Sequence, residues 1–238
     1  MKVLQILPEL NIGGVERGTL DLSKALVQKG HKSYVISNGG KLEASLIASG
    51  GNHISMPIHL KRFKTLKLAD DLFKIIKEIN PDIVHVRSRM PAWVTYRALK
   101  KFKKNKPIHV STFHGLYSFP IYSKVMAQVD HIISISKTVE DYIKTTYQVT
   151  SNKITVIPRG CDLNEFNEEP LTSEWKFDWY QEFPHTKNKR ILTLPARITK
   201  WKGVDDFIEL ISLIDNPNIH GLVVGPVSQS KEKYFKKL

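Results

Sequence analysis

The sequence predicts an α/β protein built on a parallel β-sheet. Short apolar strands alternate with helices of about 10–15 residues along the chain, which is the pattern of repeated βαβ units. The strands show little alternation of polar and apolar residues, as expected for a sheet covered on both faces. Right-handed crossovers place the carboxyl ends of parallel strands at one edge, where such proteins bind ligands. Functional residues are therefore expected in the loops that follow the strands.

The first half of the chain contains the clearest elements. Apolar residues recur at helical spacing over residues 15–29, and Gly30 ends that helix. A strongly amphipathic helix is predicted over residues 68–79 and stops before Pro81. Pro91 suits the first turn of a further helix over residues 91–103. The remaining predictions are strands at 3–7, 33–37, 53–56, 82–86, 107–112, 131–134 and 154–157, and helices at 42–47, 119–129 and 139–147.

Composition changes after Gly160. Residues 162–182 hold seven acids against one lysine, so residues 161–189 are predicted to connect an N-terminal domain (1–160) to a second domain (190–238). Trp175 and Trp179 indicate that this connection still packs against something. The second domain shows strands at 191–196 and 220–224, a helix at 204–214 and a last helix near Ser228. Because these residues are too few for a sheet of usual size, this domain is expected to be incomplete.

The bulk numbers fit a globular protein with a basic surface. Of the 238 residues 41% are hydrophobic and 25% charged, and no apolar run reaches the roughly 18 residues that a membrane-spanning helix needs. The first strand does not read as a signal peptide, and the single cysteine, Cys161, excludes an internal disulfide, so a cytoplasmic protein is expected. Net charge is +13, and residues 61–106 alone hold 14 Lys or Arg against four acids. Such a window predicts either attraction to a polyanion or a solvated surface.

Three loops carry candidate binding residues. Gly13 and Gly14 follow the first strand, where backbone N–H groups and a helix N-terminus can meet an anion; a tight turn that requires positive φ is the alternative. The spacing is not GxGxxG, which argues against NAD. Arg197 and Lys202 lie in one strand-to-helix loop, and two cations beside a helix N-terminus favour a diphosphate. His114 follows the strand PIHVST.

These loops together resemble the retaining, GT-B-type glycosyltransferases of family 4. The stretch GGVER (13–17) resembles their N-terminal glycine loop. The stretch VIPRGCDLNEF (156–166) is similar to their IPNGVD...F segment at the domain crossover, with Arg159 and Cys161 as departures. The stretch LPARITKWKGVDDFIEL (194–210) is similar to their GRL...KG...LI.A segment, with Ala196 where glycine is usual.

The resemblance implies two facing Rossmann-like domains that hold a nucleotide sugar between them. Arg197 and Lys202, with Gly13 and Gly14, would bind the phosphates of the donor, and His114 would be the catalytic residue that meets the transferred sugar. No metal and no separate cofactor are implied. Further residues expected at the acceptor or along the cleft are Glu16, Arg17, His85, Arg87 and Arg159.

The predicted function is therefore transfer of a hexose from a nucleotide sugar to a glycan or glycolipid, such as lipopolysaccharide or another cell-envelope polysaccharide. The basic window predicts peripheral contact with the anionic inner face of the membrane. Nucleic acid is not expected as a partner, because no RRM, KH or helix-turn-helix pattern is present. The family's Glu-x7-Glu element would lie beyond Leu238. The alternative is thus an inactive truncated remnant that retains only acceptor binding or weak phosphate binding.

Overall fold

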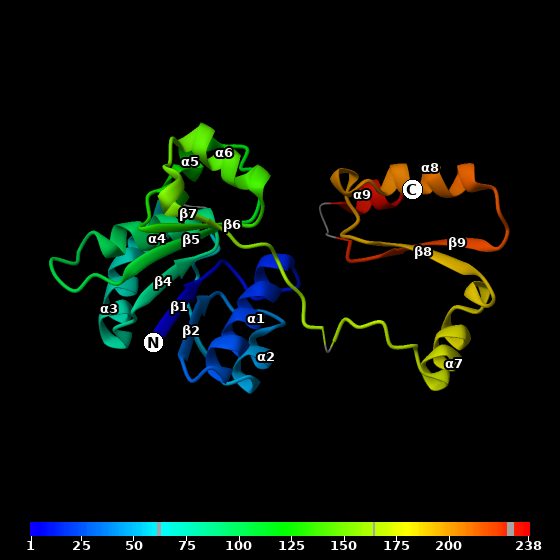
Figure 1. The fold of residues 1–238 in the computed structure, drawn as a ribbon, viewed down its shortest axis with the longest axis horizontal. Helices are drawn as coiled ribbons and strands as arrows, with labels where there is room; N and C mark the ends of the chain where they lie inside the picture. Colours follow the sequence, from blue (N-terminus) through cyan, green and yellow to red (C-terminus); the bar gives the residue numbers. More distant parts are fainter. Residues whose placement is uncertain (61–62, 164, 228–230) are drawn as a thin grey trace. The chain divides into compact units, whose positions relative to one another are not determined.

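The computed structural model describes residues 1–60, 63–163, 165–227 and 231–238 (Figure 1). Contacts divide the chain into two compact units, Met1–Phe166 and Asn167–Leu238. Lys61 and Arg62 of the basic window, and Ser228 at the expected start of the last helix, lie outside the described residues. Among the described residues no helix is both long and apolar enough to cross a bilayer.

The first unit contains one seven-stranded sheet with the order β3-β2-β1-β4-β5-β6-β7. Every neighbouring pair in it is parallel, which confirms the predicted fold class. The order runs outward in both directions from β1, as in Rossmann-like sheets. Its strands are β1 (Lys2–Ile6), β2 (Lys32–Ser37), β3 (Asn52–Ser55), β4 (Ile83–Val86), β5 (Ile108–Phe113), β6 (His131–Ser134) and β7 (Ile154–Val156).

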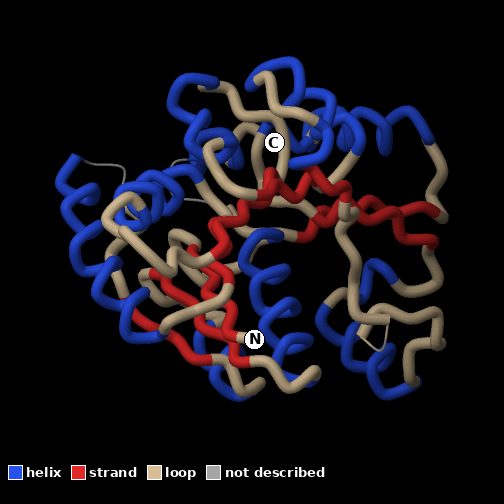
Figure 2. The backbone as a smooth tube through the Cα atoms, turned by 60° about the vertical axis from the view of Figure 1, so that its left-hand side comes forward, coloured by secondary structure: helices blue, strands red, loops and turns tan. Residues whose placement is uncertain are grey.

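Helices connect these strands and flank the sheet (Figure 2). The α-helices are α1 (Gly14–Gln28), α2 (Glu43–Ala48), α3 (Ala69–Ile79), α4 (Arg89–Leu99), α5 (Pro120–Ser123) and α6 (Lys137–Tyr147). Short 3₁₀ turns are η1 (Phe63–Leu68), η2 (Lys124–Ala127) and η3 (Ser151–Lys153). Helix α4 begins at Arg89, two residues before the predicted Pro91, and the predicted helix at 119–129 is divided between α5 and η2.

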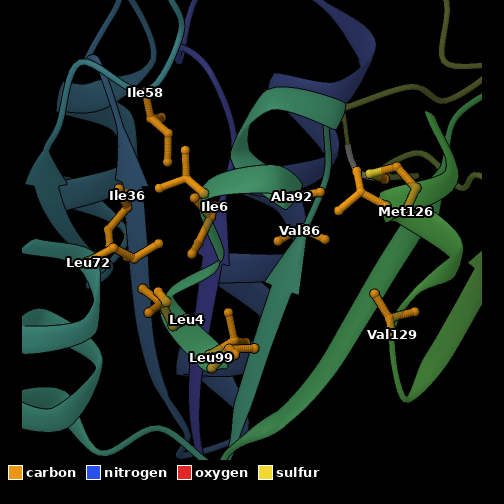
Figure 3. Close-up of a cluster of buried hydrophobic side chains, with 14 of the residues drawn as sticks. Leu4, Ile6, Ile36, Ile58, Leu72, Val86, Ala92, Leu99, Met126 and Val129 are labelled. Atoms are coloured by element: carbon orange, nitrogen blue, oxygen red, sulfur yellow. The ribbon is translucent and has the colours of Figure 1, made fainter. Parts of the chain in front are cut away.

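One face of the sheet carries the main hydrophobic core. Alternate residues of the strands, such as Leu4 and Ile6 in β1, point to this face and are fully buried. They pack against the apolar stripes of α3 and α4, including Leu72 and Ala92 (Figure 3). Removal of this apolar surface from water is the main stabilising contribution to the first unit.

The opposite face is divided into an apolar part and a polar part. Under α1 and α2 a small cluster forms around Leu7, Val35 and Leu46. Gln5 is buried on this side of β1 and donates from Nε2 to the Thr19 carbonyl of α1. Towards β4 and β5 the buried side chains on this face become polar, with His85 and Thr112, and both residues line the pocket described below.

The second unit is a parallel pair of strands with flanking helices. It contains α7 (Ser173–Glu182), η4 (Pro184–Thr186), β8 (Arg190–Pro195), η5 (Lys200–Lys202), α8 (Val204–Ile214), β9 (Ile219–Val224) and α9 (Glu232–Phe235). Helix α7 lies inside the acidic segment that was predicted only as a connection. Its aromatic residues stack on one another: the ring centroids of Trp175 and Trp179 are 5.3 Å apart, and those of Trp179 and Phe183 are 4.4 Å apart.

We expect truncation of the sheet core to destabilise the first unit strongly. Ile132 in β6 is fully buried, whereas Ile108 in β5 is 54% exposed. Ile132→Ala should lower the free energy of unfolding by about 2–5 kcal/mol, because it removes buried methyl groups and leaves a cavity. Ile108→Ala, the matched control, should cost less than about 1 kcal/mol. Urea denaturation measures both, and equal losses would contradict the assigned core.

Candidate active site

A pocket of about 570 Å³ opens in the first unit, beside α1 and the carboxyl ends of β4 to β7. One part of its lining is apolar, with Leu22, Ala25, Ile133 and Ile157. The other part contains the polar and cationic side chains of His85, Arg87, Thr112, His114 and Arg159, and the carboxylates of Asp21 and Asp162 also line the pocket. The predicted residues His85, Arg87, His114 and Arg159 thus lie around one pocket at the strand ends of the first unit.

The glycine loop does not form the tight turn that was one of the two predicted alternatives. Gly13 has φ 178°, which is ordinary extended backbone, and Gly14 is the first residue of α1. Neither has positive φ, so the tight-turn alternative is wrong. Glycine at position 13 instead leaves room for the carboxylate of Glu16, which folds back over the loop and would collide with a Cβ there. A carboxylate beside the first turn is favoured by the helix dipole, and it occupies the place where an anion was predicted.

Arg159 connects the glycine loop to the predicted catalytic histidine. Its Nη2 donates to the Gly14 carbonyl, and its Nη1 lies 3.1 Å from Nδ1 of His114. A guanidinium can only donate, so Nδ1 accepts and the neutral imidazole carries its proton on Nε2. That Nε2 is buried and has no hydrogen-bond partner among the described residues. Burial lowers the pKa of His114 to about 3, and the charges of Arg87 and Arg159 contribute in the same direction.

Arg87 lies just after β4 and is only 7% exposed. Its Nη1 donates to Oε1 of Gln5 at 2.8 Å and to the Gly18 carbonyl at 3.3 Å. Burial, reinforced by the charge of Arg159, lowers the pKa of Arg87 to about 10, which leaves it protonated at neutral pH. Its Nε has no partner among the described residues. Because Arg87 is buried, it is not part of the solvated basic surface that the charge count predicted.

Gly18 permits the two guanidinium groups to approach α1. A Cβ built at this position would lie 2.5 Å from Nη2 of Arg159 and 3.2 Å from Nη2 of Arg87. Glycine inside a helix costs about 1 kcal/mol relative to alanine. The residue is therefore unfavourable for the helix itself and favourable for the site beside it.

Other charged side chains around the two arginines form ion pairs with one another. Arg17 pairs with Asp21 at 2.9 Å and also with Glu165, and Lys24 pairs with Asp162 at 3.4 Å. These pairs hold the chain after β7 against α1. Within the part of the chain that the structure describes, no carboxylate lies at ion-pair distance from Arg87 or Arg159.

His85 forms part of the pocket wall. Its Nε2 lies 2.7 Å from Oγ1 of Thr112 on the neighbouring strand. Burial holds the pKa of His85 well below its ordinary value, with Arg87 adding to the effect, so the ring is neutral at physiological pH. Its arrangement is that of a satisfied buried histidine at the edge of the site.

Arg197 and Lys202 lie in the second unit, on the loop from β8 to α8. Both side chains are exposed, and Nζ of Lys202 lies 4.8 Å from the ring centroid of Trp201. Gly203, with φ 71°, ends η5 and begins α8, a left-handed conformation that favours glycine. The two cations therefore precede the N-terminus of α8, as predicted, and the acids Asp205 and Asp206 occupy the first turn of that helix.

Sequence reasoning missed the residues that position Arg87. Gln5 is a single amide in the apolar strand KVLQI. Because a buried amide needs hydrogen-bond partners, a glutamine in this strand indicates a buried polar contact. Gly18 carried no such signal, because its role depends on two arginines that lie far from it in the sequence.

Comparison with known proteins agrees with this architecture. The family model described as Glycosyltransferase Family 4 matches residues 12–165. A glycosyltransferase from Rickettsia africae is 33% identical, with a TM-score of 0.82, over 99% of this chain and 62% of that protein. Anabaena Alr3699/HepE in complex with UDP and glucose is 15% identical, with a TM-score of 0.76, over 100% and 64%. The gpi3 subunit of phosphatidylinositol N-acetylglucosaminyltransferase from Schizosaccharomyces pombe is 22% identical over 94% of this chain and 51% of its own length.

The fold is thus that of the GT-B glycosyltransferases, with a seven-stranded parallel sheet in the first unit and a two-stranded parallel sheet in the second. The chain belongs to glycosyltransferase family 4. It spans about half the length of the S. pombe relative and somewhat under two thirds of the solved structures.

The buried, neutral state of His114 predicts a pH-dependent stability. Its pKa is about 3 in the folded protein and near 6.5 when unfolded, so between these values only the unfolded chain binds the proton. Stability is therefore lost as pH falls below about 6.5. His114→Gln should reduce the loss between pH 6.5 and 5.5 by about 1 kcal/mol. Urea titrations measure this, with the partly exposed His31→Gln as control; an unchanged pH slope in His114→Gln would contradict the assignment.

Proposed function

We propose that this protein transfers a sugar from a nucleotide-sugar donor to a glycolipid or glycan acceptor. The family assignment is the observation that carries the proposal. The complex of Alr3699/HepE with UDP and glucose, and the name of the gpi3 subunit, support a UDP-sugar donor and a lipid acceptor. Residues 190–238 would then begin the donor-binding domain, and residues 1–160 would form the acceptor side, joined by residues 161–189.

Arg197 and Lys202 are proposed to bind the donor diphosphate. They are exposed cations on one loop that leads into α8, where the backbone N–H groups of the helix start add to their field. Sugar transfer leaves negative charge on the departing diphosphate, and fixed cations at that position stabilise the transition state more than the bound substrate. Gly13 and Gly14 are proposed to lie near the donor, provided that the Glu16 carboxylate moves away from the loop.

His114 is proposed to act as a hydrogen-bond donor to the transferred sugar. Its Nδ1 is engaged by Arg159, and its ring is neutral at physiological pH. The available function is therefore donation from Nε2–H to an oxygen, because a ring whose Nδ1 accepts from a guanidinium has no free lone pair for proton abstraction. Orientation of a sugar hydroxyl by such a donor supports positioning at the reacting carbon.

The acceptor is proposed to lie at a membrane, with lipopolysaccharide or another cell-envelope glycolipid as the expected class. The loop from β5 to α5 exposes Leu116 and Phe119, and the first turn of α5 exposes Ile121 at 91%. Exposed lysines lie on neighbouring elements that contact α4, namely Lys64 and Lys67 of η1 and Lys124 of η2. Apolar tips beside cations are suited to an anionic bilayer.

The donor assignment predicts a loss of nucleotide affinity. Arg197→Ala and Lys202→Ala should each weaken UDP binding by about 10- to 100-fold, because each removes a charge-assisted contact to the diphosphate. Lys200→Ala, an exposed lysine on the same loop, is the matched control and should change affinity less than about twofold. Isothermal titration calorimetry measures the three variants. If UDP binds all of them like the wild type, the donor site is wrongly placed.

The activity itself is tested with UDP-sugars and lipid acceptors. Release of UDP together with a mass increase of one hexose on the acceptor is the expected result. Binding of the UDP-sugar without release of UDP would favour the inactive-remnant alternative instead.

Membrane contact is tested by sedimentation with vesicles. The protein should co-sediment with vesicles that contain phosphatidylglycerol, more than with phosphatidylcholine alone, and less at high salt. The double variant Phe119→Asp with Ile121→Asp should lose most of this binding. Leu213→Asp, which changes a 76% exposed leucine in the second unit, should not. Equal sedimentation of both variants would contradict a role for the loop.

A further inference from the structure

Two guanidinium groups, those of Arg87 and Arg159, line the pocket of the first unit. Arg87 and Arg159 both approach Gly18 of α1, and neither has a carboxylate at ion-pair distance among the described residues. Two acids, Asp21 and Asp162, also line the pocket, and each is paired with a different cation: Asp21 with Arg17 and Asp162 with Lys24. Two like charges are therefore held together at one wall of a cavity.

Such an arrangement costs free energy at Arg87. Burial lowers its pKa first and the charge of Arg159 adds to the effect, while the carboxylates of Asp21 and Glu16 act in the opposite direction. Two buried donors beside the same cavity, Nε of Arg87 and Nε2 of His114, lack hydrogen-bond partners among the described residues. Buried polar groups are normally satisfied, and an unsatisfied group in a native structure points to a missing water, ion or ligand. All these groups are donors, so they need an oxygen acceptor, and an anionic oxygen also compensates the charges of the two guanidinium groups.

We propose that Arg87 and Arg159 bind a phosphoryl group of the acceptor, as a second anion site separate from the donor diphosphate site. Planar guanidinium groups match the oxygens of a phosphate through paired N–H donors. The apolar lining that continues along the pocket, Leu22, Ala25 and Ile133 among it, suits an apolar group attached to that phosphate. The inference rests on the proposed function, since it assigns Arg197 and Lys202 to the donor.

Arg159 is the residue to change, and two further variants separate its charge from its geometry. It is exposed, so its substitution should not unfold the first unit, whereas Arg87 is anchored in the buried network of Gln5 and Gly18. Arg159→Lys keeps the charge and loses the paired donors. Gly18→Ala keeps both charges but displaces the end of the Arg159 side chain, and alanine favours the helix.

The test uses phenyl phosphate and UDP as probes in calorimetric titrations of the whole chain. Arg159→Gln should weaken phenyl phosphate binding at least tenfold and leave UDP affinity within twofold. Arg159→Lys and Gly18→Ala should each give an intermediate loss, with the melting temperature of Gly18→Ala equal to or above that of the wild type. Arg97→Gln, an exposed arginine of α4, should change neither affinity.

The outcomes separate the two proposals. The anion site is overturned if the wild type does not bind phenyl phosphate, or if Arg159→Gln binds it as well as the wild type does. The acceptor assignment is overturned if Arg159→Gln weakens UDP and phenyl phosphate equally, because the two arginines would then serve the donor. If UDP binds no variant and phenyl phosphate binding still depends on Arg159, the anion site is supported and the proposed glycosyl transfer is contradicted.

Discussion

The buried guanidinium of Arg87 is the constraint on which the arrangement of the site depends. It is held at the end of β4 by the amide of Gln5 and by the carbonyl of Gly18, so it fixes the distance between α1 and the sheet. A second arginine, Arg159, can reach Gly14 and His114 only because position 18 has no side chain. The charges of both arginines, added to burial, keep His114 neutral. One buried cation thereby contributes to the position of α1, to the choice of glycine at position 18 and to the neutral state of His114.

The division of the sheet into two unlike faces explains why this network forms where it does. Helices α3, α4 and α6 cover one face with apolar side chains, and that core is large enough to stabilise the first unit. On the other face the apolar cluster under α1 and α2 is small. Beyond it the strands present His85 and Thr112, which satisfy each other, and the pocket begins. The large core on the first face stabilises the unit. The other face can therefore hold the buried charge of Arg87, which costs free energy of folding.

Periodicity was sufficient to predict the parallel α/β fold and most element positions, because apolar spacing directly reflects which side of an element is buried. It failed where local sequence does not determine the outcome. Helix α7 was missed because its acidic composition resembles a linker, although stacking between Trp175 and Trp179 orders it. The glycine loop was given a positive-φ turn as one alternative, but neither glycine has positive φ, and Glu16 folds back over the loop instead. The pairing of Arg87 with Arg159 could not be predicted, since only the fold brings residues 72 positions apart to one glycine.

The tautomer of His114 links the anion site to the chemistry. Arg159 fixes the proton on Nε2 by donating to Nδ1, and a bound phosphoryl group would offset the two charges that lower the pKa of the ring. Burial is the larger cause of that lowered pKa, and it does not disappear when an anion binds. The imidazole should therefore stay neutral with the acceptor in place. A neutral ring donates one hydrogen bond without adding a positive charge beside a carbon that becomes cationic during sugar transfer, which is the state in which His114 would favour the reaction most.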